Sequence, residues 1–598
     1  MTGGRARYRQ TRARLIALAT LAWCAPLAGQ DPTLYESERL ARVTQARGYR
    51  VATAPEGKRI AFVAVAREDV LTEDEPWPTW PNALHWLTQE DVVRRELLLD
   101  VDDAYVEERV QESMRNLRAL GIFALVRIVA VEGPDPQSVG LLVYTRDLWS
   151  LRLEMGFSGT GEAFQSTVQL TERNLFGRDK QATVRLDIDP KAFSVGEVYA
   201  DGRFAGEKLS FAESFDLIIN RDSGEPEGSQ GGLSFGRPFY DLSERWSWGL
   251  SASYSVFVRR LLQGADVVSF RESDEGPLEV CEEPGPECVR GVWASRSYGG
   301  SGSVTYRRGE RYKQSFTLGF GGSDLEVEAH EETRLRPDQE ELFEQELLPI
   351  ARTQVFPSLS YGLSLPRYVV FQNLRTFGQS ESVRVGPAIS ASFAFPLAAL
   401  GSSSSGMTFS YGAGYVWAPA DALLDASVGA GARLEDGRVS DQSISAQLRG
   451  ATPPWLLGRL VGRLSWFGQR EDTSRAQVTL GGSTLRGYES GAFRVISGNS
   501  IRGNLEYRTL PVDIWSVHLG GVLFYDAGSV YASVDDVAMH HAAGLGFRLL
   551  FPQFNRSVFR FDFGVPLDDE GFRIVVGYGS SQAVSLGEAT AGGGIRPR

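Results

Sequence analysis

The side chains that most often carry out catalysis form no recognisable catalytic motif in this sequence. The five histidines are His85, His330, His518, His540 and His541. None stands in a His-Glu-x-x-His arrangement, and no Gly-x-Ser-x-Gly segment or phosphate-binding glycine loop stands at a strand-to-helix junction. We therefore expect no enzymatic activity, no cofactor and no metal ion. A Ser–His pair assembled from distant segments leaves no local signature, so that alternative stays open.

The most unusual run of residues is 481–494, which reads Gly-Gly-Ser-Thr-Leu-Arg-Gly-Tyr-Glu-Ser-Gly-Ala-Phe-Arg. Its central residues are Gly481, Gly482, Leu485, Arg486, Gly487 and Tyr488. So many glycines predict a loop on a tight, irregular path, with a cation at its tip. Downstream, Glu506 and Asp526 each lie beside apolar strand-forming residues. They are the expected counter-ions if Arg486 reaches an enclosed interior; alternatively, these are three unrelated exposed charges.

The cysteines predict a disulfide. Cys281 and Cys288 are separated by Glu-Glu-Pro-Gly-Pro-Glu, a turn-forming segment that can bring two sulfur atoms together. Export of the chain would favour their oxidation. A metal site is the alternative, but no histidine lies near either cysteine. The third cysteine, Cys24, lacks a lipoprotein context because Trp23 stands where a small residue is needed.

Residues 1–29 have the pattern of a signal peptide. Five arginines precede an apolar run over residues 15–23, and small residues follow it. That run is far shorter than the roughly 20 residues of a membrane-spanning helix. A longer charge-free stretch, residues 385–420, is interrupted by Pro387 and Pro396. If the protein spans a membrane, we expect it to do so with strands.

The composition also favours strands and argues against nucleic acid as a partner. The net charge is −13, and no basic block occurs outside the N-terminal segment. The chain holds 65 Gly, 32 Phe, 20 Tyr and 12 Trp. Such numbers suit twisted strands bounded by belts of aromatic residues.

We expect a small α+β domain at residues 59–147, after a linker or short docking segment at residues 30–58. Strand patterns lie at residues 59–66, 125–131 and 139–145. Between the first two, Thr88 followed by acidic residues predicts the start of a helix through about residue 98. A second helical pattern runs from about residue 103 to Gly121. The predicted order is β-α-α-β-β.

From residue 151 to 579 the helical period gives way to alternating segments, which predict an all-β barrel. The clearest segment is 558–563, where three phenylalanines alternate with Arg560 and Asp562. The phenylalanines would face lipid and the charges a wet lumen. We count sixteen to twenty such segments and favour about sixteen antiparallel strands. The acidic residues 324–346 are interpreted as a solvated loop, and residues 580–598 as a flexible tail.

Three motifs together resemble the BamA/TamA superfamily of outer-membrane assembly factors, also called the bacterial surface antigen family. They are Gly-Gly-x-x-Leu-Arg-Gly-Tyr at 481–488, Leu-Glu-Tyr-Arg at 505–508 and Phe-Tyr-Asp-Ala-Gly-Ser-Val-Tyr at 524–531. The β-α-α-β-β unit resembles the family's periplasmic POTRA domain, including Arg-Glu-Leu at 95–97 and Leu-Gly-Ile-Phe at 120–123. Residues 171–177 resemble the start of the family's barrel. The resemblance covers residues 59–579.

The resemblance implies a function at the bacterial outer membrane, with the POTRA-like domain in the periplasm. It places Arg486 on an extracellular loop folded into the lumen, with Glu506 and Asp526 as its partners. The implied activity is insertion or translocation of client proteins. Client strands would pair at the POTRA edge or at the seam between the strands near 152–157 and 572–578. The implied partners are unfolded outer-membrane or secreted proteins, outer-membrane lipid and a periplasmic accessory protein, with no cofactor.

Two departures from the family's pattern leave other functions open. Only one POTRA-like unit fits before the barrel, and the chain continues about twenty residues beyond Tyr578. One alternative is a transporter of a polypeptide or lipid, similar to two-partner secretion barrels. Another is a barrel without transport activity, which would serve as a surface or enzymatic platform.

Overall fold

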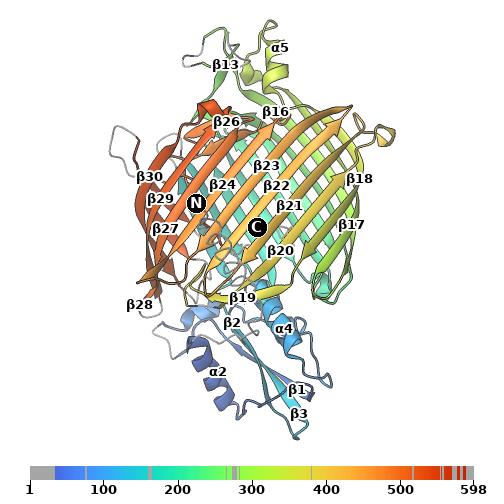
Figure 1. The fold of residues 1–598 in the computed structure, drawn as a ribbon, viewed down its shortest axis with the longest axis vertical. Helices are drawn as coiled ribbons and strands as arrows, with labels where there is room; N and C mark the ends of the chain where they lie inside the picture. The colour runs from blue at the N-terminus through green and yellow to red at the C-terminus, as the bar shows by residue number, and fades with distance from the viewer. Residues whose placement is uncertain are drawn as a thin grey trace, which may run out of the picture.

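The computed structural model consists of a large β-barrel, a small α/β domain below it and a lobe above it (Figure 1). It describes residues 34–586, except 74–76, 159–163, 264, 273–278, 282, 284, 379, 515–516, 552–553, 555–557, 569–574 and 580–583. The predicted signal peptide, Cys24 and most of the predicted tail lie outside the described residues.

The α/β domain has the predicted β-α-α-β-β order. Its elements are β1 (Arg59–Glu68), η1 (Trp80–Leu84), α3 (Glu90–Arg94), α4 (Glu107–Leu120), β2 (Phe123–Glu132) and β3 (Ser138–Asp147). The sheet order is β1-β3-β2, with β3 parallel to β1 and antiparallel to β2. The apolar face of α4, which includes Met114 and Leu117, packs on this sheet. Gly121 ends α4 with φ +73°, a left-handed conformation that glycine adopts without strain.

Of the two alternatives for residues 30–58, the docking segment is observed, because the helix α2 (Leu34–Ala46) packs Leu40 and Val43 on the sheet face opposite α4. One expectation for this region needs correction. Thr88 does not cap a helix, because α3 begins at Glu90 and ends at Arg94. The Thr88 hydroxyl instead donates a hydrogen bond to buried Asp147 at 2.8 Å. A buried carboxylate needs such donors, and this tertiary contact replaces the local cap.

The barrel is a closed antiparallel sheet. Its strands are β4 (Leu151–Ser158), β5 (Gln165–Glu172), β6 (Lys180–Ile188), β7 (Ala192–Asp201), β8 (Ser210–Asn220), β9 (Pro226–Arg237), β10 (Trp246–Arg260), β16 (Val292–Arg308), β17 (Lys313–Ala329), β18 (Arg352–Ser364), β19 (Arg367–Gln372), β20 (Ser380–Ala394), β21 (Gly406–Trp417), β22 (Leu423–Glu435), β23 (Arg438–Ala451), β24 (Gly458–Arg470), β27 (Asn499–Thr509), β28 (Val512–Ile514), β29 (Val517–Tyr531), β30 (His540–Leu550), β31 (Phe559–Pro566) and β32 (Val575–Gly579). The backbones of Tyr578 and Phe157 pair where β32 meets β4, so the predicted seam closes the barrel.

The preferred number of sixteen strands is too low for the described chain. Twenty strands follow one another around the barrel once β19 and β28 are set aside, because β18 also pairs with β20 and β27 with β29. Very short turns explain the difference. Only Asp436 and Gly437 separate β22 from β23, and residues 189–191 separate β6 from β7. A turn of this length barely interrupts the alternation of side chains along the sequence.

The barrel strands present different side chains on their two faces, as the alternation predicts. On β31, Arg560 and Asp562 are buried inside the barrel. The alternating Phe559, Phe561 and Phe563 are only half-buried on the other face. The same alternation leaves Leu505, Leu523 and Leu545 about half exposed or more on the outer face. Charges are therefore enclosed and apolar side chains are presented outward. Among the described residues, no helix is long and apolar enough to cross a membrane.

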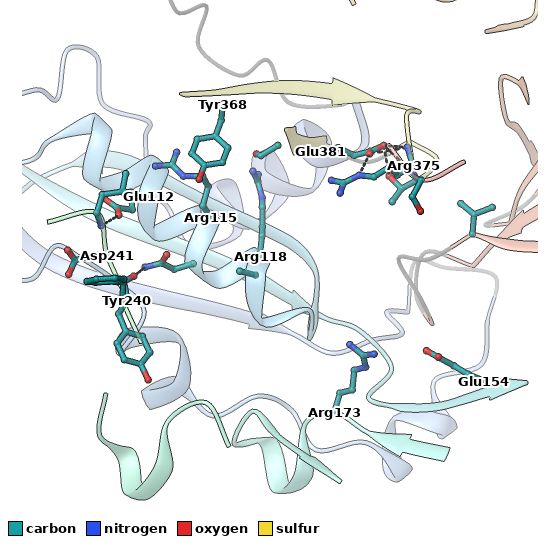
Figure 2. Close-up of a pocket in the computed structure, with 18 of the residues that line it drawn as sticks. Glu112, Arg115, Arg118, Glu154, Arg173, Tyr240, Asp241, Tyr368, Arg375 and Glu381 are labelled. Atoms are coloured by element: carbon teal, nitrogen blue, oxygen red, sulfur yellow. Dashed lines mark hydrogen bonds and ion pairs between the residues drawn. The ribbon is translucent and has the colours of Figure 1, made fainter. Parts of the chain in front are cut away.

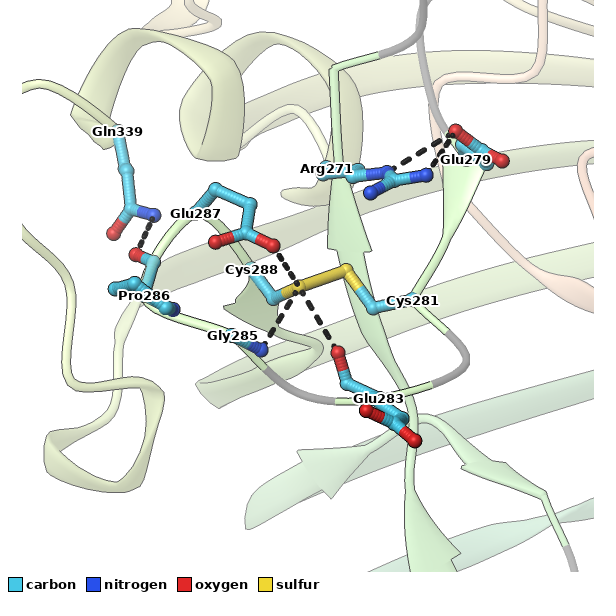
Figure 3. The surroundings of a disulfide bond; sticks show 9 residues. All are labelled: Arg271, Glu279, Cys281, Glu283, Gly285, Pro286, Glu287, Cys288 and Gln339. Carbon is cyan, nitrogen blue, oxygen red and sulfur yellow. Dashed lines mark hydrogen bonds and ion pairs between the residues drawn. A yellow bond between two sulfur atoms is a disulfide. The ribbon is translucent and has the colours of Figure 1, made fainter.

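The lobe above the barrel contains the predicted disulfide between Cys281 and Cys288 (Figure 3). Its elements are β11 (Leu262–Gln263), β12 (Asp266–Val267), β13 (Ser269–Arg271), β14 (Glu279–Val280), β15 (Val289–Arg290), η5 (Glu331–Thr333), α5 (Glu340–Leu342) and η6 (Phe343–Leu347). The acidic residues 324–346 are only partly the expected solvated loop. Their first part belongs to β17, and Phe343 is fully buried in the apolar core of the lobe. Isolated apolar residues within a run of acids conceal this packing in the sequence.

A further correction concerns the C-terminal tail, which was expected to be flexible. Its described residues, Val584, Ser585 and Leu586, lie in the barrel, and Val584 and Leu586 are fully buried. Apolar contacts with the strands β19, β20 and β22–β24 hold them, and the intervening polar serine obscured this pattern.

Buried polar contacts attach the α/β domain to the barrel. Glu96 and Arg203 form an ion pair of 2.7 Å, and each side chain is only 5% exposed. The Arg203 guanidinium also stacks over the ring of Tyr240. On α4, Asn116 donates to the Tyr240 carbonyl, and Glu112 accepts from the backbone N–H of Leu242. The turn between β9 and β10, residues 238–245, therefore holds α4 at the lower opening of the barrel.

We predict that Arg203→Ala loosens this attachment, because it leaves Glu96 buried without its closest cationic partner. Breaking a buried pair from one side costs about 3 to 5 kcal/mol. Limited proteolysis of the folded barrel should release the α/β domain faster than in the unchanged protein. The matched control is Arg59→Ala, which removes an exposed pair with Asp102 worth about 0 to 1 kcal/mol. Equal cleavage rates for the two variants would contradict the assignment.

Candidate functional site

The lumenal loop, defined as residues 481–491, folds into the barrel. It joins β25 (Gln477–Leu480) to β26 (Phe493–Ile496), a hairpin at the upper rim (Figure 1). Arg486 at its tip reaches side chains of β27, β29 and β31. The segment predicted as an unusual loop is therefore enclosed by the barrel wall.

The guanidinium of Arg486 is held by the two predicted acids. Its Nε and Nη2 donate to the two carboxylate oxygens of Asp526 at 2.7 and 2.8 Å, and its Nη1 donates to Glu506 at 2.7 Å. The backbone N–H of Arg486 also donates to Asp526. Arg486 is 4% exposed and both acids are 0% exposed. The alternative of three unrelated exposed charges is therefore wrong.

A third acid and further arginines extend this arrangement beyond the prediction. Asp562 on β31 accepts from Arg486 at 3.4 Å and from Arg548 and Arg560 at 2.6 and 3.1 Å. Arg508 donates to the second oxygen of Glu506 at 2.7 Å. We call Arg486, Glu506, Asp526 and Asp562 the Arg486 cluster. The alternation of β31 placed Asp562 in the lumen, but nothing local linked it to a loop about 75 residues earlier.

The glycines of the loop are required by close backbone approaches. Gly487 has φ +104°, and an added Cβ would lie 2.9 Å from the Cβ of Ala542. Gly481 has φ +133°, and an added Cβ would lie 1.9 Å from the Glu489 carbonyl oxygen. Any other residue would strain the backbone and clash at both positions. Gly482 also has a positive φ, of +56°.

Apolar packing holds the sides of the loop. Leu485 is fully buried and Tyr488 is 5% exposed, in a cluster with Leu480 and Ala542. The Tyr488 hydroxyl donates to the His541 carbonyl at 3.2 Å. All six predicted loop residues therefore have a structural reason for their type.

A polar cavity of about 1140 Å³ lies between α4 and the lower end of the barrel (Figure 2). Glu112, Arg115 and Arg118 line it from α4. Burial raises the pKa of Glu112 above its ordinary value, although the N–H of Leu242 opposes this shift. Across the cavity, Arg375 donates to Glu381 at 3.0 Å. The cavity at the mouth of the barrel is therefore lined by charged side chains of both signs.

Sequence reasoning did not find a buried Ser–His–Asp group where the α/β domain joins the barrel. His85 Nε2 lies 3.0 Å from Asp147, and His85 Nδ1 lies 3.2 Å from the Ser150 hydroxyl. The His85 and Asp147 side chains are 1% and 0% exposed, and Ser150 is 3% exposed. Asp147 also accepts two hydrogen bonds from Thr88. A substrate could not reach the serine in this enclosed joint, so the geometry indicates a structural role.

No group of three or more histidine, cysteine or acidic side chains in the described part of the chain is arranged to hold a metal ion. Cys281 and Cys288 are joined to each other, so the metal alternative for this pair is excluded.

We predict that Arg486→Ala releases the lumenal loop, because it leaves the acids Glu506 and Asp526 buried without their shared cation. The loss should be about 3 to 5 kcal/mol, and protease should cut the loop faster. Arg486→Lys should restore only part of the protection, since an ammonium cannot make the bidentate contact. Arg271→Ala is the matched control, because it removes an exposed ion pair with Glu279 in the lobe above the barrel. Unchanged protection in Arg486→Ala would contradict the assignment.

We further predict that Ser150→Ala leaves any activity of the protein unchanged, because the hydroxyl serves only the joint. His85→Ala should lower the free energy of unfolding by about 1 to 3 kcal/mol, the cost of a lost buried hydrogen-bond partner. Thermal unfolding and activity measured on both variants distinguish these roles. Loss of activity with unchanged stability in Ser150→Ala would instead indicate a nucleophile.

No family model matches the sequence. A Treponema pallidum (strain Nichols) protein, named as a candidate outer membrane protein assembly factor, is 27% identical over 178 residues. That match covers 28% of this chain and 21% of the relative, so the chain spans only a fraction of that protein's length.

Three solved structures are similar at low sequence identity. BamA from Haemophilus ducreyi lacking POTRA domains 1–3 is 14% identical, with a TM-score of 0.34 and coverage of 92% of this chain and 94% of that one. CdiB from Escherichia coli is 12% identical, with a TM-score of 0.41 and coverage of 96% and 98%. CdiB from Acinetobacter baumannii is 11% identical, with a TM-score of 0.40 and coverage of 97% and 87%.

The description of the fold rests on the strand pairing of this chain and not on these structures, whose TM-scores are below 0.5. The Treponema pallidum relative, which is named as a candidate outer membrane protein assembly factor, supports the resemblance stated from the Arg-Gly-Tyr motif. The chain is similar to proteins named as an outer membrane assembly factor, BamA and CdiB.

Proposed function

We propose that this chain is a member of the BamA/TamA superfamily that assists insertion or translocation of client proteins at the bacterial outer membrane. The observation that carries the proposal is the Arg486 cluster. A loop with the family's Arg-Gly-Tyr motif is folded into the lumen and bonded to acids at both matching positions, Glu506 and Asp526. In this proposal the α/β domain is a single POTRA-like domain in the periplasm.

The distribution of polar groups supports a membrane location. A membrane interior offers no water to unpaired backbone groups, so a spanning sheet must close on itself. This sheet is closed, with enclosed charges such as Asp562 and an outer face that carries exposed leucines such as Leu523. A water-soluble barrel would reverse that arrangement. The oxidised Cys281–Cys288 pair suits an exported chain.

The edge of the small sheet supports a role in binding client strands. In the described residues, β1 pairs with β3 on one side. On its other edge the backbone of residues 102–105 pairs with residues 58–60, and arginine side chains bind carbonyls farther along the strand. The Val63 carbonyl accepts from Arg94 at 3.0 Å, and the Val65 carbonyl accepts from Arg47 at 3.3 Å. An incoming strand can offer backbone N–H groups to the same carbonyls. The two arginines then act as displaceable substitutes for a client.

The seam supports lateral exchange of strands. The first and last strands of the barrel meet there, where β32 pairs with β4 through the backbones of Tyr578 and Phe157. The cluster acid Asp562 lies on β31, the strand next to β32. Opening at this seam would therefore take place beside the Arg486 cluster. The energy for insertion would come from folding of the client, with no enzymatic step and no cofactor.

A second candidate is passage of a polypeptide through the lumen, as in the two-partner-secretion-like alternative. The polar cavity favours it, because arginines and acids line a space of about 1140 Å³ between α4 and the barrel, which could admit a polypeptide. Both candidates use the same lumen and differ in whether the client leaves through the seam.

The experiment that tests the proposal is reconstitution into liposomes with an unfolded barrel client. We expect the client to become heat-modifiable and protease-protected faster than in empty vesicles. A disulfide across the seam, from Phe157→Cys with Tyr578→Cys, joins positions that are paired in the backbone register. Oxidation should stop insertion, and reduction should restore it.

The outcomes separate the candidates. Insertion that continues across an oxidised seam would overturn lateral exchange, and transfer of the client into the vesicle interior would then favour passage through the lumen. A barrel that accelerates neither process would contradict the proposed function and leave a surface barrel without transport activity.

A further inference from the structure

The described C-terminal segment, Val584-Ser585-Leu586, occupies the lower lumen. Val584 and Ser585 line the cavity that α4 closes from below. The exposed fraction of both Val584 and Leu586 is 0%. The segment therefore lies between the α/β domain and the Arg486 cluster, on the route that a client entering from below would follow.

The barrel wall provides an apolar patch for this segment. The buried residues of the patch are Phe371, Leu374, Val383, Leu423, Ala451 and Val461. They come from β19, β20 and β22–β24 and from the turn after β19. Exposing these apolar side chains to water in the lumen would be unfavourable. The patch is therefore more stable when another apolar segment covers it. Val584 and Leu586 cover it here.

Two arginines bind the backbone of the same segment. Arg508 donates to the Val584 carbonyl at 2.8 Å, and Arg449 donates to the Ser585 carbonyl at 3.1 Å. Arg449 is itself held by Asp425 on the neighbouring strand β22. These contacts recognise backbone carbonyls, which every peptide has. Selectivity comes from the two apolar side chains spaced two residues apart.

The site is also joined to the Arg486 cluster. Arg508 donates through Nη2 to Val584 and through Nε to Glu506, which binds Arg486. One guanidinium therefore contacts both the tail and an acid of the cluster. Removing the tail leaves this guanidinium with a free donor directed at the lumen.

We propose that the lower lumen contains a peptide-binding site for apolar-x-apolar segments, occupied in this structure by Val584-Ser585-Leu586 of the same chain. A membrane-bound barrel strand alternates in the same way, with apolar residues two positions apart. A client segment of that pattern competes with the tail for the patch and for Arg449 and Arg508. The proposal rests on the proposed function for the identity of the competitor, whereas the site itself is defined by the tail.

The test is binding of a fluorescent peptide with the sequence of residues 582–588, Gln-Ala-Val-Ser-Leu-Gly-Glu, to the barrel in detergent micelles. A chain shortened to residues 1–583 should bind it saturably. The full chain should bind it at least tenfold more weakly, because its own tail competes. A peptide with aspartate at the positions of Val584 and Leu586 should not bind, and one with alanine at Ser585 is the matched control that should. In the full chain, Val584→Asp with Leu586→Asp should restore binding of the unchanged peptide.

Equal binding to the full and shortened chains, or no binding to a shortened chain that retains its heat-modifiable fold, would overturn the proposal. Arg449→Met in the shortened chain checks the backbone contact separately and should weaken peptide binding. This measurement requires no client. A barrel that binds the peptide but accelerates no insertion refutes only the proposed function, and one that inserts clients without binding the peptide refutes only the site.

Discussion

The guanidinium of Arg486 must find acidic partners, because a lone charge enclosed by the barrel would cost many kcal/mol of lost hydration. Its partners come from three different strands, since Glu506 lies on β27, Asp526 on β29 and Asp562 on β31. The ring of Phe524 covers one face of the guanidinium at 3.7 Å. The dependence is strongest for Asp526, because the hydrogen bonds described for its carboxylate all come from Arg486. Arg508 also binds Glu506, and Arg548 and Arg560 also bind Asp562. One loop side chain therefore links three strands of the wall on the side that leads to the seam.

A series of contacts, interrupted by the lower cavity, leads from this cluster to the α/β domain. The domain is fixed to the barrel turns by the Glu96–Arg203 pair and at its joint by Asp147 and His85. Its helix α4 lines the lower cavity, and the described tail residues line the same cavity from above. Arg508 then joins the tail to Glu506.

The sequence predicted those features that a local pattern determines. Alternation identified the strands and the lumenal face of β31, the Arg-Gly-Tyr motif identified the loop and its acids Glu506 and Asp526, and a Pro-Gly turn identified the disulfide. Other contacts between distant segments, which no motif indicates, escaped prediction. Asp562 joins the cluster, and Ser150 reaches His85, only because the barrel closes and the domain docks. The tail escaped for a similar reason, since two apolar residues among glycines and serines show no periodicity until a patch on the wall receives them.

The most direct test of the Arg486 cluster is a double-mutant cycle between the loop and the wall. Arg486→Ala, Asp526→Ala and the double variant would be unfolded in urea from lipid vesicles, with the unchanged chain as reference. The account predicts a coupling free energy of about 1 to 3 kcal/mol between the two residues, because each single change leaves the other charge buried. Additive losses, with a coupling free energy near zero, would show that Arg486 and Asp526 do not hold each other and would contradict the account.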